Sequence, residues 1–167
     1  MAKTVWFDMD GTLYDLYNIP NWLERLEEKD EGVFYHGTMM YNPFRIEQAI
    51  DALIAHGWQV GVITWAPKGI EKDDPFFAKV ENIKRFWLKR FYPALLENFY
   101  CLPYGESKSV CACDHWKERS LDPDMGVQIL VDDNMLVRDE WASGWESHFK
   151  TIDATEDYTK QLEGLVM

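Results

Sequence analysis

The sequence is poor in cysteine, in positive charge and in long apolar runs. Its only cysteines are Cys101, Cys111 and Cys113. An odd number of cysteines, with no secretory apolar segment at the N-terminus, is typical of a reducing cytosol rather than of a disulfide scaffold. No apolar run approaches the roughly 20 residues that are needed to span a bilayer. We therefore expect a soluble, cytoplasmic protein that has no membrane partner.

Positive charge is scarce, because 17 lysines and arginines stand against 29 aspartates and glutamates, and the net charge is −12. A surface with this charge repels the nucleic-acid backbone, so we expect no nucleic acid polymer as a partner. A small anionic substrate would need a local cationic group or a metal ion to be held. The 167 residues are 47% hydrophobic and 15% aromatic. This composition predicts a single globular domain over residues 1–167 and sets no oligomeric state.

Apolar segments of strand length alternate with helical segments along most of the chain. Strands are expected at residues 4–8, 58–64, 98–102, 127–131 and 147–152. Helices are expected at residues 42–57 and 74–93, and in the tail, where Tyr158, Leu162 and Leu165 share one face. This alternation predicts an α/β fold of three layers, Rossmann-like, with a parallel sheet of about five strands and helices on both faces.

The expected helix at residues 74–93 has two faces of different character. Its apolar face is formed by residues at helical spacing: Phe76, Val80, Ile83, Trp87 and Phe91. Its basic residues are assigned to the opposite, solvated face: Lys79, Lys84, Arg85, Lys89 and Arg90. In so acidic a chain, a solvated face is favoured over a stripe that binds nucleic acid.

Residues 15–41 do not fit the alternation of strands and helices. They contain a short amphipathic helix, expected at residues 20–29, with Trp22, Leu23 and Leu26 on its apolar side. A connection of this length in a compact domain is usually functional or disordered, and this one is too aromatic for disorder. We expect it to form a small cap or flap that is inserted after the first strand.

Two of the expected strands are followed by pairs of carboxylates. The stretch VWFDMDGTLYDLY places Asp8 and Asp10 at the end of the first strand, and ILVDDN places Asp132 and Asp133 at the end of the fourth. Close like charges repel one another, and burial increases the cost. Ligands bind at the carboxyl edge of an open parallel sheet, so neighbouring strands would bring four carboxylates to one crevice. Such an all-oxygen site suits Mg²⁺ better than zinc.

The first of these motifs resembles that of a known family. Residues 8–13, DMDGTL, match the D-x-D-G-T-[LV] pattern of the haloacid dehalogenase superfamily, and they follow a strand as that pattern does. Later motifs follow in the family's order: VGVIT ends in Thr64, YGESKS supplies Lys108, and ILVDDN supplies the acidic pair. The resemblance covers about residues 4–152 and leaves the 15–41 insert and the tail unmatched.

The resemblance implies a Mg²⁺-dependent phosphatase that hydrolyses a small phosphomonoester through an aspartyl-phosphate intermediate. Asp8 would be the nucleophile. Asp10 would be the acid that protonates the leaving oxygen and then the base that activates water. Thr64 would hydrogen-bond a phosphate oxygen, and Lys108 would neutralise charge in the transition state.

The resemblance also implies metal ligands and further substrate contacts. Mg²⁺ would be held by Asp8, by the main-chain carbonyl of Asp10 and by the acidic pair, with Asp133 as the direct ligand and Asp132 as its support. Other contacts are expected beside the motifs: Gly11 permits the tight turn, Thr12 can hydrogen-bond within it, and Trp65 should lie near the crevice.

The short insert resembles that of the 5′(3′)-deoxyribonucleotidase branch, so a nucleoside monophosphate is the first substrate to consider. The aromatic residues that could stack on a base are Tyr14, Tyr17, Phe34, Tyr35 and Tyr41. The alternative is that these residues only pack the insert onto the core.

Several alternatives stay open. Lys117, in HWKERS, could replace Lys108 as the lysine of the third motif. The stretch CACDH at residues 111–115 could bind zinc, but it lacks a second ligand pair, and small buried cysteines are the simpler interpretation. A protein phosphatase of the D-x-D-G-T type and a non-catalytic binding protein of the same fold are alternative functions. A receiver domain is disfavoured, because its acidic pair follows the first strand rather than a late one.

Overall fold

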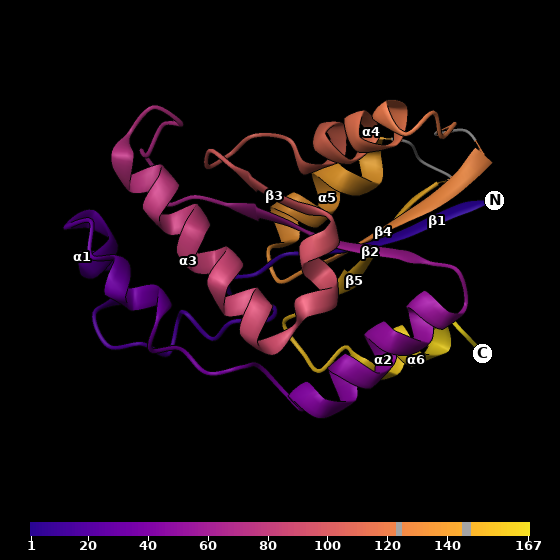
Figure 1. The fold of residues 1–167 in the computed structure, drawn as a ribbon, viewed down its shortest axis with the longest axis horizontal. Helices are drawn as coiled ribbons and strands as arrows, with labels where there is room; N and C mark the ends of the chain where they lie inside the picture. Colours follow the sequence, from indigo (N-terminus) through magenta and orange to yellow (C-terminus); the bar gives the residue numbers. More distant parts are fainter. Residues whose placement is uncertain (123–124, 145–147) are drawn as a thin grey trace.

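Five parallel strands form the centre of the computed structural model, which describes residues 1–122, 125–144 and 148–167. The strands are β1 (Ala2–Phe7), β2 (Gln59–Trp65), β3 (Phe99–Leu102), β4 (Gly126–Asp132) and β5 (Phe149–Asp153). They pair in the order β3-β2-β1-β4-β5 (Figure 1). All five expected strands are present, although residue 147, expected to begin the last one, lies outside the described residues.

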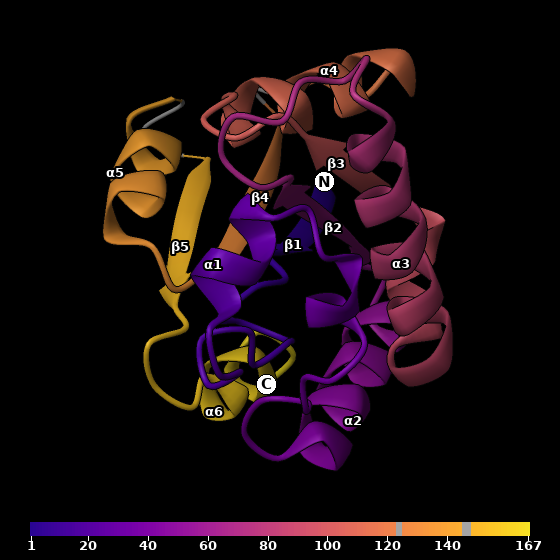
Figure 2. The ribbon, with the colours of Figure 1, turned by 90° about the vertical axis from the view of Figure 1, so that its left-hand side faces the viewer.

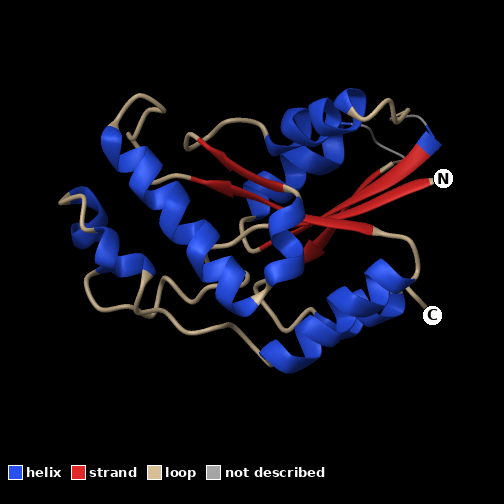
Figure 3. Ribbon diagram, in the orientation of Figure 1, coloured by secondary structure: helices blue, strands red, loops and turns tan. Residues whose placement is uncertain are grey.

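Helices connect the strands and cover both faces of the sheet (Figure 3). On one face pack α2 (Pro43–Ala55), α3 (Pro75–Phe91) and α6 (Thr159–Gly164). On the other pack α4 (Lys108–Glu118) and α5 (Met135–Gly144). The predicted three-layer α/β class is therefore confirmed. No helix in the described part of the chain is both long and apolar enough to cross a membrane.

The side chains of β1 show why both faces of the sheet need a helical layer. Val5 and Phe7 point into the core on the side of α2, α3 and α6, whereas Trp6 points into the core on the side of α4 and α5. Side chains alternate between the two faces of a strand, so an uninterrupted apolar run is stable only when both faces are covered. The one polar atom of Trp6 is satisfied, because Nε1 donates to Gln128 Oε1 at 2.7 Å.

The ends of the two long helices follow the local signals in the sequence. Asn42 accepts a hydrogen bond from the backbone N–H of Arg45, and Asp74 accepts one from that of Phe76. Each of these caps is followed by a proline, which suits the first turn of a helix. The caps therefore set where α2 and α3 begin.

The segment 15–41 contains α1 (Trp22–Glu27) and a 3₁₀ turn, η1 (Glu31–Phe34). The helix is shorter than the expected 20–29, because Asn21 and Lys29 adopt left-handed backbone conformations with φ of 56° and 57°. Figure 2 shows α1 in front of the carboxyl ends of β1 and β4. An ion pair of 2.7 Å between Lys29 and Asp74 ties the segment to the start of α3.

Gly61 lies in β2 where no side chain fits. An added Cβ would come within 2.6 Å of the Trp6 ring and would also meet the backbone of Asn98. We expect Gly61→Ala to lower the free energy of unfolding by about 1–3 kcal/mol, because overpacking forces the neighbours to shift. Urea unfolding followed by tryptophan fluorescence measures this change. Gly164→Ala is the control, because nothing lies within 4 Å of the added Cβ, and it should not lower stability.

Candidate active site

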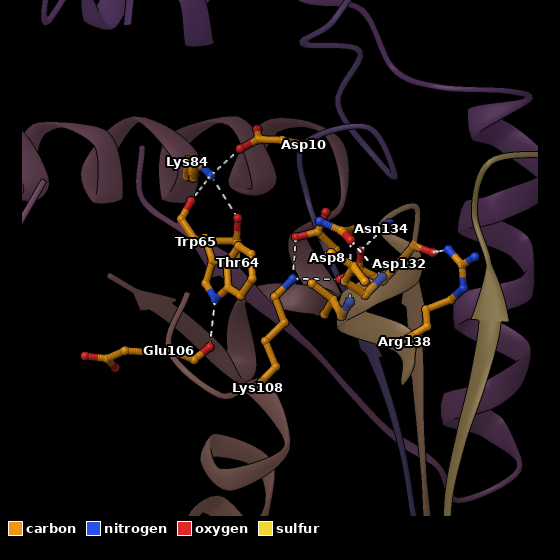
Figure 4. Close-up of polar contacts among 12 residues, drawn as sticks. Asp8, Asp10, Thr64, Trp65, Lys84, Glu106, Lys108, Asp132, Asn134 and Arg138 are labelled. Carbon is orange, nitrogen blue, oxygen red and sulfur yellow. Dashed lines mark hydrogen bonds and ion pairs between the residues drawn. The ribbon is translucent and has the colours of Figure 1, made fainter. Parts of the chain in front are cut away.

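The pairing of β1 with β4 brings Asp8 next to the acidic pair. Phe7 is in register with Val131, and the backbone N–H of Asp8 donates to the carbonyl of Val131 at 2.9 Å. Asp8 and Asp132 therefore occupy neighbouring positions at the carboxyl edge of the sheet (Figure 4). Both are nearly inaccessible to solvent. The carboxylates converge only if the first and fourth strands are neighbours, and β1 and β4 are neighbours.

Lys108 joins these two carboxylates. It is the first residue of α4, and its Nζ donates to Asp8 Oδ1 at 2.7 Å and to Asp132 Oδ2 at 2.8 Å. Burial alone would lower the pKa of Lys108, but the two carboxylates reverse this and raise the pKa overall. Lys117 lies on the exposed side of α4, where its Nζ forms an ion pair with Asp114 at 3.5 Å. Of the two candidate lysines, Lys108 is the one that the fold places in the site.

Three carboxylates lie close enough together to bind one metal ion. Asp8, Asp132 and Asp133 each offer an oxygen within 4.8 Å of the others. Burial is the main cause that raises the pKa values of Asp132 and Asp133, and the charge of Asp8 raises them further. Within the described ranges this is the only group of three potential ligands, so the CACDH stretch forms no such group there.

The side chain of Asp10 turns away from this cluster towards Lys84. Lys84 Nζ donates to Asp10 Oδ2 at 2.8 Å, to Thr64 Oγ1 at 2.8 Å and to the carbonyl of Trp65 at 2.9 Å (Figure 4). Burial raises the pKa of Asp10, and the Lys84 ammonium acts in the opposite direction. Only the main-chain carbonyl of Asp10, not its carboxylate, was predicted as a metal ligand, and the position of its side chain agrees with that distinction.

The assignment of Lys84 to a solvated helix face is wrong. Its side chain is fully buried. Lys84 lies four residues after Val80 and three before Trp87, both of which face the core, so its position on the helix is an inward one. The spacing is visible in the sequence, but Lys84 was assigned to the solvated face because it is charged.

The remaining predicted residues divide into two groups. Trp65 lines the cavity described below, and its Nε1 donates to the carbonyl of Glu106 at 2.9 Å. Gly11, Thr12 and Thr64 are not among the residues that line this cavity.

Gly11 is needed at its position, because its φ is 80° and a Cβ would collide with the Asp133 carboxylate. The expected hydrogen bond from the Thr12 side chain is not found. Its Oγ1 is buried and has no partner among the described residues. The Thr64 hydroxyl is also buried, and it accepts the hydrogen bond from Lys84.

Asn134 and Arg138 were not predicted, yet both support Asp132. The backbone N–H of Asn134 donates to Asp132 Oδ1 at 2.8 Å, and its side chain caps α5 through the N–H of Leu136. Arg138 Nη1 donates to the carbonyl of Asp132 at 2.8 Å. Asparagine ahead of a helical segment is a common cap, so the contact between the Asn134 side chain and Leu136 had a local signal.

A cavity of about 380 Å³ opens over this group of charges. Asp8, Asp10, Asp133 and Lys108 line it from the sheet edge. The segment 15–41 lines it from the other side with Tyr17, Trp22, Leu23, Leu26, Glu27 and Phe34. This volume falls within the range of pockets that take small molecules.

Aromatic rings make up much of the wall of the cavity. Tyr17 and Trp22 are in edge contact with ring centres 5.0 Å apart, and Trp65 and Tyr104 have ring centres 4.8 Å apart. Of the five aromatic residues considered for stacking, Tyr17 and Phe34 line the cavity, whereas the other three do not: Tyr14, Tyr35 and Tyr41. Tyr14 instead joins the insert to the core. Its hydroxyl donates to the carbonyl of Val33 at 2.6 Å, and its ring is in edge contact with that of Trp87 in α3, with ring centres 5.2 Å apart.

No family model matches this sequence, and no curated protein sequence matches it. Solved structures do match its fold. A haloacid dehalogenase-like family hydrolase from Xanthomonas campestris superposes with a TM-score of 0.53 at 13% identity, over 98% of this chain and 96% of that one. A haloacid dehalogenase-like hydrolase from Burkholderia xenovorans gives 0.52 at 11% identity, over 95% and 85%.

A third match is D,D-heptose 1,7-bisphosphate phosphatase from Burkholderia thailandensis. It has a TM-score of 0.50 at 13% identity, over 96% of this chain and 98% of that one. At these identities the matches show the fold alone. The protein therefore has the fold of the haloacid dehalogenase-like hydrolases.

Proposed function

We propose that this protein is a Mg²⁺-dependent phosphatase that hydrolyses a small phosphomonoester through an aspartyl-phosphate intermediate. The observation that carries the proposal is the convergence of Asp8, Lys108 and the acidic pair on the wall of one cavity. A neighbour of the same fold is named a bisphosphate phosphatase, which supports the reaction class. The motifs at residues 8–13 and 129–134 support it independently.

The acidic cluster fits a hard divalent cation, because its donors are carboxylate oxygens. We assign Asp8, the main-chain carbonyl of Asp10 and Asp133 as direct ligands. Asp132 is assigned a supporting role, since Lys108 and the N–H of Asn134 each hold one of its oxygens. When bound, Mg²⁺ would offset the negative charge of the carboxylates and of the phosphate.

The reaction would proceed in two displacements. In the first, a carboxylate oxygen of Asp8 forms a bond to phosphorus while the ester P–O bond breaks, and Asp10 gives a proton to the leaving oxygen. In the second, water attacks the aspartyl-phosphate, Asp10 takes a proton from that water, and inorganic phosphate leaves Asp8. Burial raises the pKa of Asp10 and so favours the protonated form that the first step requires.

Lys108 and Thr64 would stabilise the phosphoryl group during its transfer. Lys108 already contacts Asp8 and lines the cavity, so its ammonium lies where negative charge accumulates on the phosphate. Thr64 is proposed as a phosphate ligand from its motif.

A nucleoside monophosphate is the proposed substrate class. The rings that line the cavity offer flat apolar surface for a base. Three of them come from the segment 15–41, one ends β2 and one follows β3. In this proposal the segment 15–41 acts as a small cap on a single domain.

Replacing the proposed nucleophile should abolish turnover. We expect Asp8→Asn to lower the hydrolysis of p-nitrophenyl phosphate in Mg²⁺ by about 1,000-fold or more, because the amide cannot attack phosphorus. Initial rates with and without Mg²⁺ measure this. The control is Asp51→Asn on the exposed face of α2, which should keep full activity. A folded Asp8→Asn variant with wild-type turnover would show that the mechanism is wrong.

Removing one charge from the acidic cluster should stabilise the metal-free protein. Folding raises the pKa of the Asp133 carboxyl from 3.8 to about 7, so the folded state holds this proton more tightly than the unfolded state does. The wild type should therefore lose stability as pH rises from about 4 to about 7. At pH 8 we expect Asp133→Asn to raise Tm by roughly 2–4 °C, which corresponds to about 1 kcal/mol.

The same variant should lose the response to the ion. Mg²⁺ should raise the Tm of the wild type and leave that of Asp133→Asn unchanged, because an ion stabilises only a folded protein that binds it. Calorimetry in EDTA and in Mg²⁺ measures both effects. Asp139→Asn, an exposed position on α5, is the control and should behave as the wild type. A Mg²⁺ shift that persists in Asp133→Asn would contradict the assignment of this ligand.

Trimming the aromatic wall should affect only substrates that carry a flat group. We expect Trp22→Leu to raise KM for a nucleoside monophosphate about 10-fold, since stacking on one base contributes about 1–3 kcal/mol. The KM for glycerol phosphate should not change. Tyr35→Leu removes an exposed aromatic ring of the same segment that lies outside the cavity, and it should change neither value. Equal effects of Trp22→Leu on both substrates would argue against base stacking.

A further inference from the structure

Lys84 is a buried lysine for which the motifs of the sequence provide no role. All three N–H bonds of its ammonium have an acceptor at 2.8–2.9 Å: Asp10 Oδ2, Thr64 Oγ1 and the carbonyl of Trp65. Its side chain is fully buried. A lysine with three satisfied donors has no proton left to offer a substrate, so its effect must act through its partners.

The contact with Lys84 sets the orientation of the Asp10 carboxylate. Oδ2 is held by the ammonium, whereas Oδ1 is buried and has no hydrogen-bond partner in the described part of the chain. A buried oxygen without a partner is costly, so a carboxylate left to itself would rotate to share its contacts. Lys84 therefore holds one of the two oxygens and fixes the orientation of the carboxylate, which lines the cavity.

The second and third contacts fix the lysine itself. Thr64 and Trp65 end β2, so the ammonium is anchored to the carboxyl edge of the sheet rather than to a mobile loop. The Phe34 ring of η1 packs over Nζ at 5.2 Å and also lines the cavity. Lys84 thereby connects the sheet edge, the insert and Asp10.

The two buried lysines hold different carboxylates. Lys108 contacts Asp8 and Asp132, and Lys84 contacts Asp10. We propose that Lys84 is a positioning residue that holds the Asp10 carboxylate in place for proton transfer to the leaving oxygen. This inference rests on the proposed phosphatase function, in which Asp10 is the acid.

The leaving group distinguishes positioning of an acid from a merely structural role. The p-nitrophenolate ion departs readily without a proton, whereas the alkoxide of glycerol phosphate needs one. A defect in the acid should therefore slow the alkyl ester much more than the aryl ester. A variant that only disturbs the fold should slow both esters alike.

The experiment compares kcat for p-nitrophenyl phosphate and for glycerol phosphate in Mg²⁺. We expect Lys84→Gln, which keeps two N–H donors but loses the charge and the third N–H, to lower kcat about 10-fold more on glycerol phosphate than on p-nitrophenyl phosphate. Asp10→Asn should show the same pattern more strongly. Lys89→Met is the matched control, because it changes an exposed lysine of the same helix, and its two rates should equal those of the wild type.

The double variant Asp10→Asn/Lys84→Met tests whether Lys84 acts through Asp10. It removes both charges of the pair, so it leaves no buried charge without its partner even if Lys84→Met alone does not fold. We expect its rates on both esters to equal those of Asp10→Asn, because a positioning residue adds nothing once its target is gone.

Three results would count against the inference or the function. Equal losses on the two esters in Lys84→Gln, or a double variant clearly slower than Asp10→Asn, would overturn the positioning role while leaving the phosphatase assignment intact. A wild type that hydrolyses neither ester in Mg²⁺, nor a nucleoside monophosphate, would contradict the proposed function, and the inference would fall with it.

Discussion

The mutual repulsion of four carboxylates at one edge of the sheet is the constraint on which the site depends. Asp8, Asp10, Asp132 and Asp133 line the same cavity. Two buried ammonium groups contact three of them at 2.7–2.8 Å, so two negative charges are in excess when all four carboxyls are ionised. Buried charges are tolerated only when they are paired and hydrogen-bonded. The excess equals the charge of one divalent cation, in agreement with the proposed Mg²⁺ site.

The topology of the sheet explains why the charges meet there. In the strand order β3-β2-β1-β4-β5, the chain builds outward from β1 first on one side and then on the other. Open α/β sheets bind ligands in a crevice at the carboxyl ends of the strands where the order changes in this way, which here is between β1 and β4. The lysines reach this crevice from opposite layers. Lys108 comes from α4 on one face of the sheet, and Lys84 comes from α3 on the other (Figure 4). Each layer therefore contributes one cation to the same edge.

Most of the fold could be predicted from local patterns, and the exceptions have physical causes. The five apolar runs and the caps at Asn42 and Asp74 are signals within a few residues, so the strands and the helices α2 and α3 were predicted close to their observed ends. The helix of the insert came out shorter than predicted, because its ends depend on left-handed backbone at Asn21 and Lys29, residue types that occur in many other conformations. The sequence could not show which aromatic residues of the insert face the cavity, because that depends on how the segment 15–41 packs over the sheet.

The sequence by itself determined the carboxylates of the site, because each pair directly follows an apolar strand and needs no distant information to be recognised. Only the tertiary structure decided the cations. The partners of Lys84 and Lys108 lie as far as 74 and 100 residues away in the chain, so no local pattern reveals them. The helical spacing of Lys84 indicated an inward position, but only the packing of α3 and α4 on the sheet shows which carboxylates Lys84 and Lys108 reach. A charge becomes part of a site only where packing removes it from water and supplies its partner.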